Sequence, residues 1–82
     1  MLDKYRSQIN QIDDQILQLL DQRFSVTKKV GEYKRENNIE VLNQNREQQI
    51  IDKIIGMNLT NEKEVLEMYK FLMDVSKRQQ DE

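Results

Sequence analysis

The sequence contains no cysteine, no histidine and no proline, and only two of its 82 residues are glycine. Without cysteine it has neither a disulfide framework nor a thiolate metal site. Without histidine it lacks the commonest metal ligand, the usual general base and the Ser-His nucleophile pair. The missing prolines and scarce glycines argue against a turn-rich all-β fold and leave no flexible linker. Any catalysis must therefore depend on Arg, Lys, Glu, Asp, Asn, Gln, Ser or Tyr.

The charge balance and the apolar content of the chain restrict its partners and location. Its 13 cationic and 15 anionic residues give a formal net charge of −2, and their even spread along the chain is a poor footprint for binding duplex nucleic acid. No apolar run is long enough to span a bilayer, and we expect no signal peptide. The length predicts one domain over residues 1–82. We therefore expect a cytoplasmic protein with no nucleic-acid or membrane partner.

The first part of the chain carries the clearest pattern. Its stripe residues recur alternately three and four positions apart, which predicts one continuous helix of about 34 residues. The stripe consists of Leu2, Tyr5, Ile9, Ile12, Ile16, Leu19, Arg23, Val26, Val30 and Tyr33. In a stripe this regular, Gly31 indicates close packing and not a break. We expect the helix to end at Asn37-Asn38, because asparagine tolerates the left-handed conformation.

Two shorter helices are predicted after a connector at residues 39–42. The first spans about residues 45–55 and ends at Gly56, a frequent C-terminal stop. The second begins after Asn61, an N-cap residue whose capping-box partner is Glu64. The apolar stripe of this last helix consists of Val65, Met68, Tyr69, Leu72 and Val75. The expected fold class is therefore all-α, with three helices per chain.

The predicted helix lengths indicate a partner chain. At 1.5 Å per residue the first helix is about 50 Å long, whereas the other two measure about 17 and 30 Å and cannot cover both of its ends. A chain this polar also has little core to offset an ordering entropy of about 1.5 kcal/mol per residue. The simplest solution is a homodimer whose long helices pair across a two-fold axis.

Arg23 occupies a position in the stripe where the heptad requires an apolar residue. Because a buried guanidinium without a partner is costly, either the stripe opens to water here or an anion meets the arginine. On position alone, two interpretations are simpler: Arg23 fixes the register of a coiled coil, or its side chain extends out of the helix bundle until the charge reaches water. Lys34 favours the anion, because it lies on the same helix face about 16 Å away and the two cations can converge on a small polyanion.

Arg6 is a third cation next to the stripe. On a straight helix it lies about 26 Å from Arg23 and 42 Å from Lys34, too far for one small molecule to reach all three. In an antiparallel dimer centred near Leu17, Arg6 of one chain lies level with about residue 28 of the other, between its Arg23 and Lys34. This geometry predicts two identical sites that each borrow one arginine.

Other polar residues are expected on the same side of the molecule. Arg46 and Glu47, preceded by Asn43, open the second predicted helix beside the connector that must fold back. Ser76 and Gln80 lie one turn apart, where the apolar stripe of the third helix should continue. Each of these residues taken singly is more often an ordinary surface residue without a specific role, so the hypothesis of a polar site rests on the joint pattern.

Three segments resemble the all-α chorismate mutase family and together cover nearly the whole chain. The resemblance to the first helix is carried by YRSQINQIDDQILQLLDQRFSVTKKVGEYKRE, that to the second-helix entry by NQNREQQI, and that to the C-terminal helix by FLMDVSKRQQ. The first-helix signature is an arginine followed by I-D-x-x-I/L, L-x-x-R and K-x-x-G-x-x-K. The resemblance implies an intertwined helical homodimer with two active sites. It also implies the conversion of chorismate to prephenate, the branch-point step toward phenylalanine and tyrosine in the shikimate pathway.

The resemblance implies a role for each cation of the first helix. Arg6 corresponds to the arginine donated across the dimer, and Arg23 to the main carboxylate-binding arginine. Lys34 corresponds to the lysine that binds a carboxylate and the ether oxygen of the substrate. No cofactor and no metal are implied.

The resemblance also implies roles for the polar residues of the other helices. Glu47 resembles the acidic residue that holds the ring hydroxyl, and Arg46 an arginine that lines the pocket. Ser76 resembles a carboxylate contact, and Gln80 the amide that hydrogen-bonds the ether oxygen. Asn43 departs from the family, which usually has an aspartate contacting the ring hydroxyl at this position. Since asparagine still hydrogen-bonds but carries no charge, we expect weaker hydroxyl binding and retained activity.

The implied reaction suits a chain without histidine or cysteine. It is a unimolecular Claisen rearrangement that needs no nucleophile, metal, cofactor or obligatory proton transfer. The enzyme must hold a flexible dianion in its compact pseudo-diaxial form and stabilise negative charge that develops on the ether oxygen. Arg6 and Arg23 suit the first task, because guanidinium groups match carboxylates. Lys34 and Gln80 suit the second.

Three other functions are compatible with the sequence. Isochorismate-pyruvate lyases resemble this fold and use a similar cationic pocket, and an assay with both substrates separates the two activities. The helices also suit a regulatory module that binds chorismate or prephenate and is attached to another shikimate-pathway enzyme. Low activity that rises sharply with such a partner favours this function. A structural coiled-coil dimer without a ligand explains the heptad but not the alignment of the polar residues.

Overall fold

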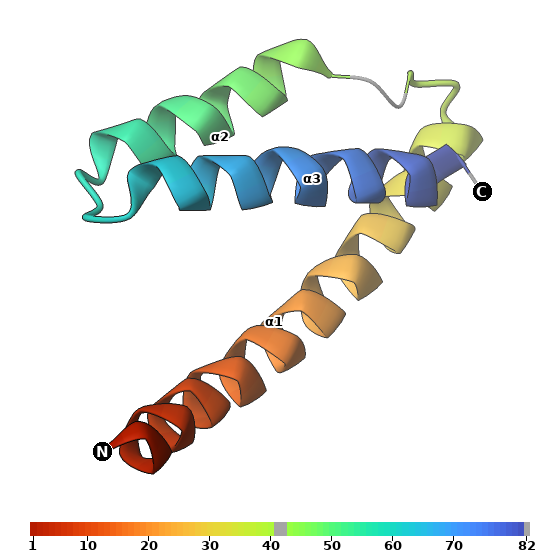
Figure 1. The fold of residues 1–82 in the computed structure, drawn as a ribbon. Helices are drawn as coiled ribbons and strands as arrows, with labels where there is room; N and C mark the ends of the chain where they lie inside the picture. Colours follow the sequence, from red (N-terminus) through yellow and green to blue (C-terminus); the bar gives the residue numbers. More distant parts are fainter. Residues whose placement is uncertain (41–42, 82) are drawn as a thin grey trace.

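The chain forms three α-helices, shown in Figure 1 in a computed structural model that describes residues 1–40 and 43–81. They are α1 (Leu2–Glu36), α2 (Gln44–Gly56) and α3 (Glu62–Asp81). The all-α class and the three predicted helices are confirmed, whereas residues 41 and 42 of the predicted connector lie outside the described residues. Within the described part of the chain, no helix is both long enough and apolar enough to cross a bilayer.

The first helix, α1, is a single unbroken helix of 35 residues, as the heptad stripe predicts. It ends in a Schellman motif, in which the Ile39 amide donates to the Lys34 carbonyl at 2.8 Å and the Asn38 amide to the Arg35 carbonyl at 3.4 Å. Asn38 adopts the left-handed conformation, with φ of 55°. The predicted stop at the asparagine pair is therefore confirmed.

The second helix, α2, extends one residue beyond the predicted range at each end. The helix ends at Gly56, the predicted stop, but Gly56 is its last helical residue and the left-handed residue that follows is Asn58, with φ of 52°. After the glycine the chain makes one tighter turn, in which the Met57 amide donates to the Ile54 carbonyl at 3.2 Å. Asparagine thus reverses the chain two residues after the glycine, as it does at the end of α1.

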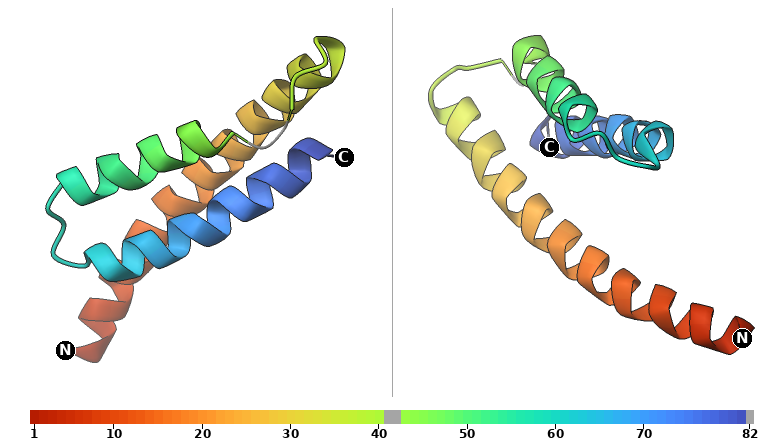
Figure 2. Two further views of the ribbon diagram at one scale, coloured as in Figure 1. Left: turned by 90° about the horizontal axis from the view of Figure 1, so that it is seen from above. Right: turned by 90° about the vertical axis from the view of Figure 1, so that its left-hand side faces the viewer.

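The third helix, α3, contacts both other helices. It begins at Glu62, directly after the predicted N-cap Asn61. It lies antiparallel to α2, and its C-terminal end crosses the C-terminal part of α1 (Figures 1 and 2). The crossing is close, because a Cβ atom added to Gly31 would lie 2.9 Å from the Cα atom of Gln80. Gly31 is the buried residue of α1, so the predicted close packing is confirmed.

The N-terminal part of α1 extends away from the other helices, as Figure 1 and the right-hand view of Figure 2 show. Its apolar stripe is exposed, with Ile12 at 55% and Leu19 at 61% of full exposure. The radius of gyration is 15.6 Å, against about 12 Å for a compact domain of this length. The accessible surface is 7123 Å², against about 5,200 Å² for a folded monomer of this mass. A single chain therefore exposes about 1,900 Å² more than a compact fold of its size.

Candidate active site

The half-buried Arg23 of α1 is anchored by α3. Its Nη1 atom donates to Ser76 Oγ at 2.6 Å, and that hydroxyl donates to the Leu72 carbonyl at 2.8 Å. Ser76 is only 4% exposed, so the guanidinium is bonded to a residue that lies in the protein interior. The Arg23 guanidinium carbon also lies 6.0 Å from the centroid of the Tyr69 ring, within the range of a cation–π contact. These neutral partners orient the guanidinium without compensating its charge.

Lys34 meets Gln80 at the other end of the crossing. The ammonium Nζ donates to Gln80 Oε1 at 3.2 Å, and both side chains are half-buried. Because this bond uses the carbonyl oxygen of the amide, the two N–H donors of Gln80 are left for another acceptor. The crossing of α1 and α3 therefore presents a guanidinium, an ammonium and an amide, each held by an interhelical hydrogen bond.

The α2 helix adds charged residues to this side of the molecule. Glu47 Oε1 lies 3.8 Å from Lys77 Nζ, which ties the first turn of α2 to α3. A cavity of about 390 Å³ between the helices is lined by three cations, Arg23, Arg46 and Lys53, together with uncharged and mostly apolar residues. Among the described residues that line it, none is acidic. A cationic cavity without carboxylates favours an anionic ligand.

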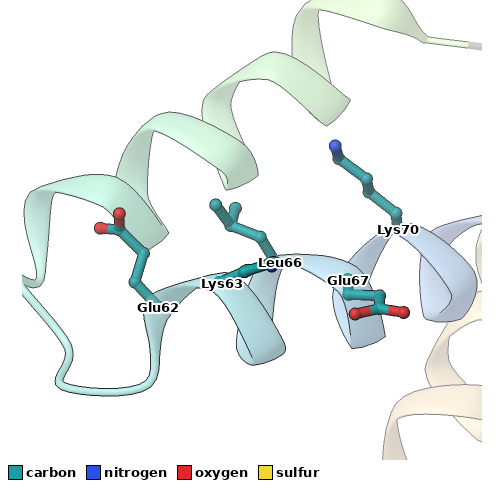
Figure 3. A pocket seen from close by; sticks show the side chains of 5 residues that line it. All are labelled: Glu62, Lys63, Leu66, Glu67 and Lys70. Carbon is teal, nitrogen blue, oxygen red and sulfur yellow. The ribbon is translucent and has the colours of Figure 1, made fainter.

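A second hollow, of about 460 Å³, lies along α3 and is shown in Figure 3. It is lined by Glu62, Lys63, Leu66, Glu67 and Lys70. All five residues come from one helix, two acidic and two basic side chains balance each other, and none of the predicted site residues is among them. We therefore place the candidate site at the α1–α3 crossing and the adjoining cationic cavity.

The structure separates Arg6 from the other predicted site residues. Because α1 is unbroken between Arg6 and Arg23, the two residues are about 26 Å apart along the helix axis. Five of the other predicted residues lie at the crossing or along the cationic cavity, and Glu47 contacts α3 beside them. These five are Arg23, Lys34, Arg46, Ser76 and Gln80. A single chain thus brings together the predicted set without Arg6 and Asn43.

Some contacts at the crossing were missed by sequence reasoning. Thr27 Oγ1 lies 2.5 Å from Gln79 Oε1, which adds a polar bond between α1 and α3. The available signal was that Thr27 lies one turn after Arg23 on the same helix face. Lys77, the ion-pair partner of Glu47, directly follows Ser76, but its spacing does not distinguish it from a solvated lysine.

Asn43 is the N-cap of α2. Its Oδ1 atom accepts a hydrogen bond from the Arg46 amide at 3.0 Å, one of the donors that the first turn of a helix leaves unpaired. Asn43 therefore fixes the turn that carries Arg46 and Glu47. Its contact with a ring hydroxyl stays a prediction.

The cap gives Asn43 a measurable contribution to stability. We expect Asn43→Ala to lower the free energy of unfolding by about 1 kcal/mol, because the Arg46 amide loses its acceptor. Asn43→Asp should retain the stability, since aspartate caps helices as well as asparagine does. Urea denaturation at a fixed protein concentration measures both changes. Equal stability of the alanine variant and the unaltered chain would contradict the capping role.

These features define an all-α domain that gathers cationic side chains at a helix crossing and in the adjoining cavity. The family model described as chorismate mutase type II matches residues 5–81, and the chain therefore belongs to the chorismate mutase type II family. Over 57 residues, 70% of its length, the chain is 37% identical to the bifunctional chorismate mutase/prephenate dehydratase of Aquifex aeolicus (strain VF5). The match spans 16% of that relative's length. No solved structure matches the chain.

Proposed function

We propose that this chain is a chorismate mutase that rearranges chorismate to prephenate in a site shared between two subunits. One observation carries the proposal: Lys34 is paired with Gln80 at the same helix crossing where Arg23 is anchored by Ser76. Chorismate carries two carboxylates and an ether oxygen, and these are the groups that a guanidinium, an ammonium and an amide recognise. Membership of the chorismate mutase type II family supports the same assignment.

In the proposed mechanism the cations first select the shape of the substrate. Arg23, with Arg46 beside it in the cavity, binds carboxylate and holds the flexible dianion in its compact pseudo-diaxial form. The ether C–O bond then breaks as a C–C bond forms in the same molecule, so no atom is gained or lost. Negative charge grows on the ether oxygen, where Lys34 Nζ and the Gln80 amide donate hydrogen bonds. Glu47 accepts a hydrogen bond from the ring hydroxyl.

The shared site rests on the exposed stripe of α1. The stripe is exposed, and the excess surface of roughly 1,900 Å² on one chain exceeds the about 800 Å² per partner that a stable protein–protein interface buries. If two α1 helices pair antiparallel about a centre near Leu17, the partner's Arg6 lies between Arg23 and Lys34. The site then gains the second arginine that a dicarboxylate requires.

A charge on the stripe should dissociate this dimer. We expect Ile12→Glu to raise the dimer dissociation constant by about 10³-fold, because each dimer would bury two unpaired carboxylates. Sedimentation equilibrium measures the change. The matched control is Gln18→Glu, which adds the same charge to α1 away from the stripe and should leave the dimer intact. A chain that is monomeric before substitution, or an Ile12→Glu dimer of unchanged affinity, would contradict the proposed pairing.

The activity itself is tested by following the absorbance of chorismate and identifying the product. We expect chorismate to disappear with prephenate as the product, and isochorismate to yield no pyruvate. Pyruvate release without prephenate would make the chain an isochorismate-pyruvate lyase. Low turnover that rises sharply with a second shikimate-pathway enzyme would make it a module of a larger assembly. The name of the bifunctional relative supports such an association.

The proposed location is the cytoplasm, which fits a chain without cysteine.

A further inference from the structure

Gln80 lies near the end of α3, where a side chain is difficult to hold in place. The α3 helix ends at Asp81, so the Gln80 carbonyl is one of the last four, which have no partner within the helix. Terminal turns fray because they lack these bonds. A hydrogen bond between the Gln80 amide and Lys34 therefore requires contacts that fix this turn from outside the helix.

Two residues of α1 supply such contacts on the backbone of Gln80. Arg35 Nη1 donates to the Gln80 carbonyl at 2.6 Å, which satisfies the unpaired acceptor and places a cation at the negative end of α3. Gly31 faces the same residue, since a Cβ atom there would lie 2.9 Å from Gln80 Cα and 3.2 Å from its carbonyl oxygen. These neighbours are backbone atoms, so they cannot swing away as the end of a flexible side chain can.

We propose that Gly31 and Arg35 are positioning residues that fix the Gln80 amide beside Lys34 Nζ, where the ether oxygen is to be bound. Gly31 sets the distance between the helices, and Arg35 holds the last turn of α3 in register. Neither residue touches the substrate. The expected effect on rate rests on the proposed mutase function. The contacts of Gly31 and Arg35 with the Gln80 backbone, here called the clamp, exist without substrate.

The kinetic test uses substitutions that remove each contact from the full chain. Arg35→Met keeps the length of the side chain but removes the donor, and we expect kcat for chorismate to fall about 10-fold with KM changed less than about 2-fold. Arg35→Lys restores the donor and should recover most of kcat. Gly31→Ala displaces the end of α3, and we expect kcat to fall about 10²-fold.

The matched control is Arg78→Met. Arg78 lies in the last turn of α3, and its ion-pair partner among the described residues is the exposed Asp74, 3.4 Å away. This substitution removes the same charge from the same region without touching the clamp, so kcat should not change. If Arg35→Met and Gly31→Ala retain full kcat, or if Arg35→Met raises KM alone, the positioning role is overturned.

A second readout needs no turnover. In ¹⁵N NMR spectra of the unliganded chain, the side-chain amide of Gln80 should move toward the position of a free glutamine amide in Arg35→Met and stay in place in Arg78→Met. The Gln80 signals are assigned by their loss in Gln80→Glu. If the unaltered chain does not rearrange chorismate, the proposed function fails, and this shift still supports the clamp. An unmoved Gln80 amide in Arg35→Met overturns the clamp whatever the activity.

Discussion

Replacing Lys34 with alanine should lower kcat/KM for chorismate by at least about 10²–10³-fold, because the ether oxygen loses a preorganised charged donor. Lys34 is half-buried and bonded to Gln80 at 3.2 Å, so the ammonium needs no reorganisation to meet the oxygen. The loss should appear mainly in kcat, since charge on the oxygen develops only as the C–O bond breaks. Steady-state absorbance assays of both variants measure the effect.

A matched control separates this effect from unfolding or a general loss of charge. Lys29 is exposed on α1, five residues before Lys34 and on the opposite face of the helix. Lys29→Ala should keep full activity, and circular dichroism should show both variants to be equally helical. Near-full turnover by Lys34→Ala would remove Lys34 from the catalytic site.

Two inactive variants should restore activity when they exchange subunits. Arg6→Ala and Arg23→Ala each remove an arginine from every site of their own homodimer, and we expect each to lose about 10²-fold or more in kcat/KM. If the partner's Arg6 completes each site, a mixed dimer contains one intact site and one that lacks both arginines. Random exchange at equal concentration should then recover about a quarter of the unaltered activity, since half of the dimers are mixed.

The exchange experiment distinguishes sharing from action within one chain. If Arg6 served the site of its own subunit, every site of a mixed dimer would lack one arginine and no activity would return. Mixing Arg23→Ala with Lys34→Ala is the control. Both residues of a site come from the same subunit, so one site of the mixed dimer lacks Arg23, the other lacks Lys34, and no activity should return. Recovery in the first mixture alone is the expected result.

Periodicity predicted α1 well because its signals are local. The heptad stripe gave a helix without a break, the asparagine pair matched the Schellman motif at Asn38, and Gly31 marked the place where α3 approaches. The end of α2 was predicted only in part, because Gly56 and Asn58 both suit a helix stop. The helix ends at Gly56, and a tighter turn after it leads to Asn58, which adopts the left-handed conformation.

The candidate site was only partly predictable, for a physical reason. Helical spacing places Arg23 and Lys34 on one face of α1, and Ser76 and Gln80 on one face of α3, so each set was predictable separately. Their pairing depends on how α1 crosses α3, and periodicity does not set a crossing angle. For the same reason the contact of Arg35 with the Gln80 carbonyl had no signal in the sequence.

The most direct measurement is a crystal structure of the chain with a stable dicarboxylate that mimics the compact form of chorismate. We predict a dimer in which one carboxylate binds Arg23 and the other binds the partner's Arg6. The ether oxygen should lie within hydrogen-bond distance of both Lys34 Nζ and the Gln80 amide. A bound monomer, or a ligand that leaves Arg23 and Lys34 facing solvent, would contradict the shared dicarboxylate site.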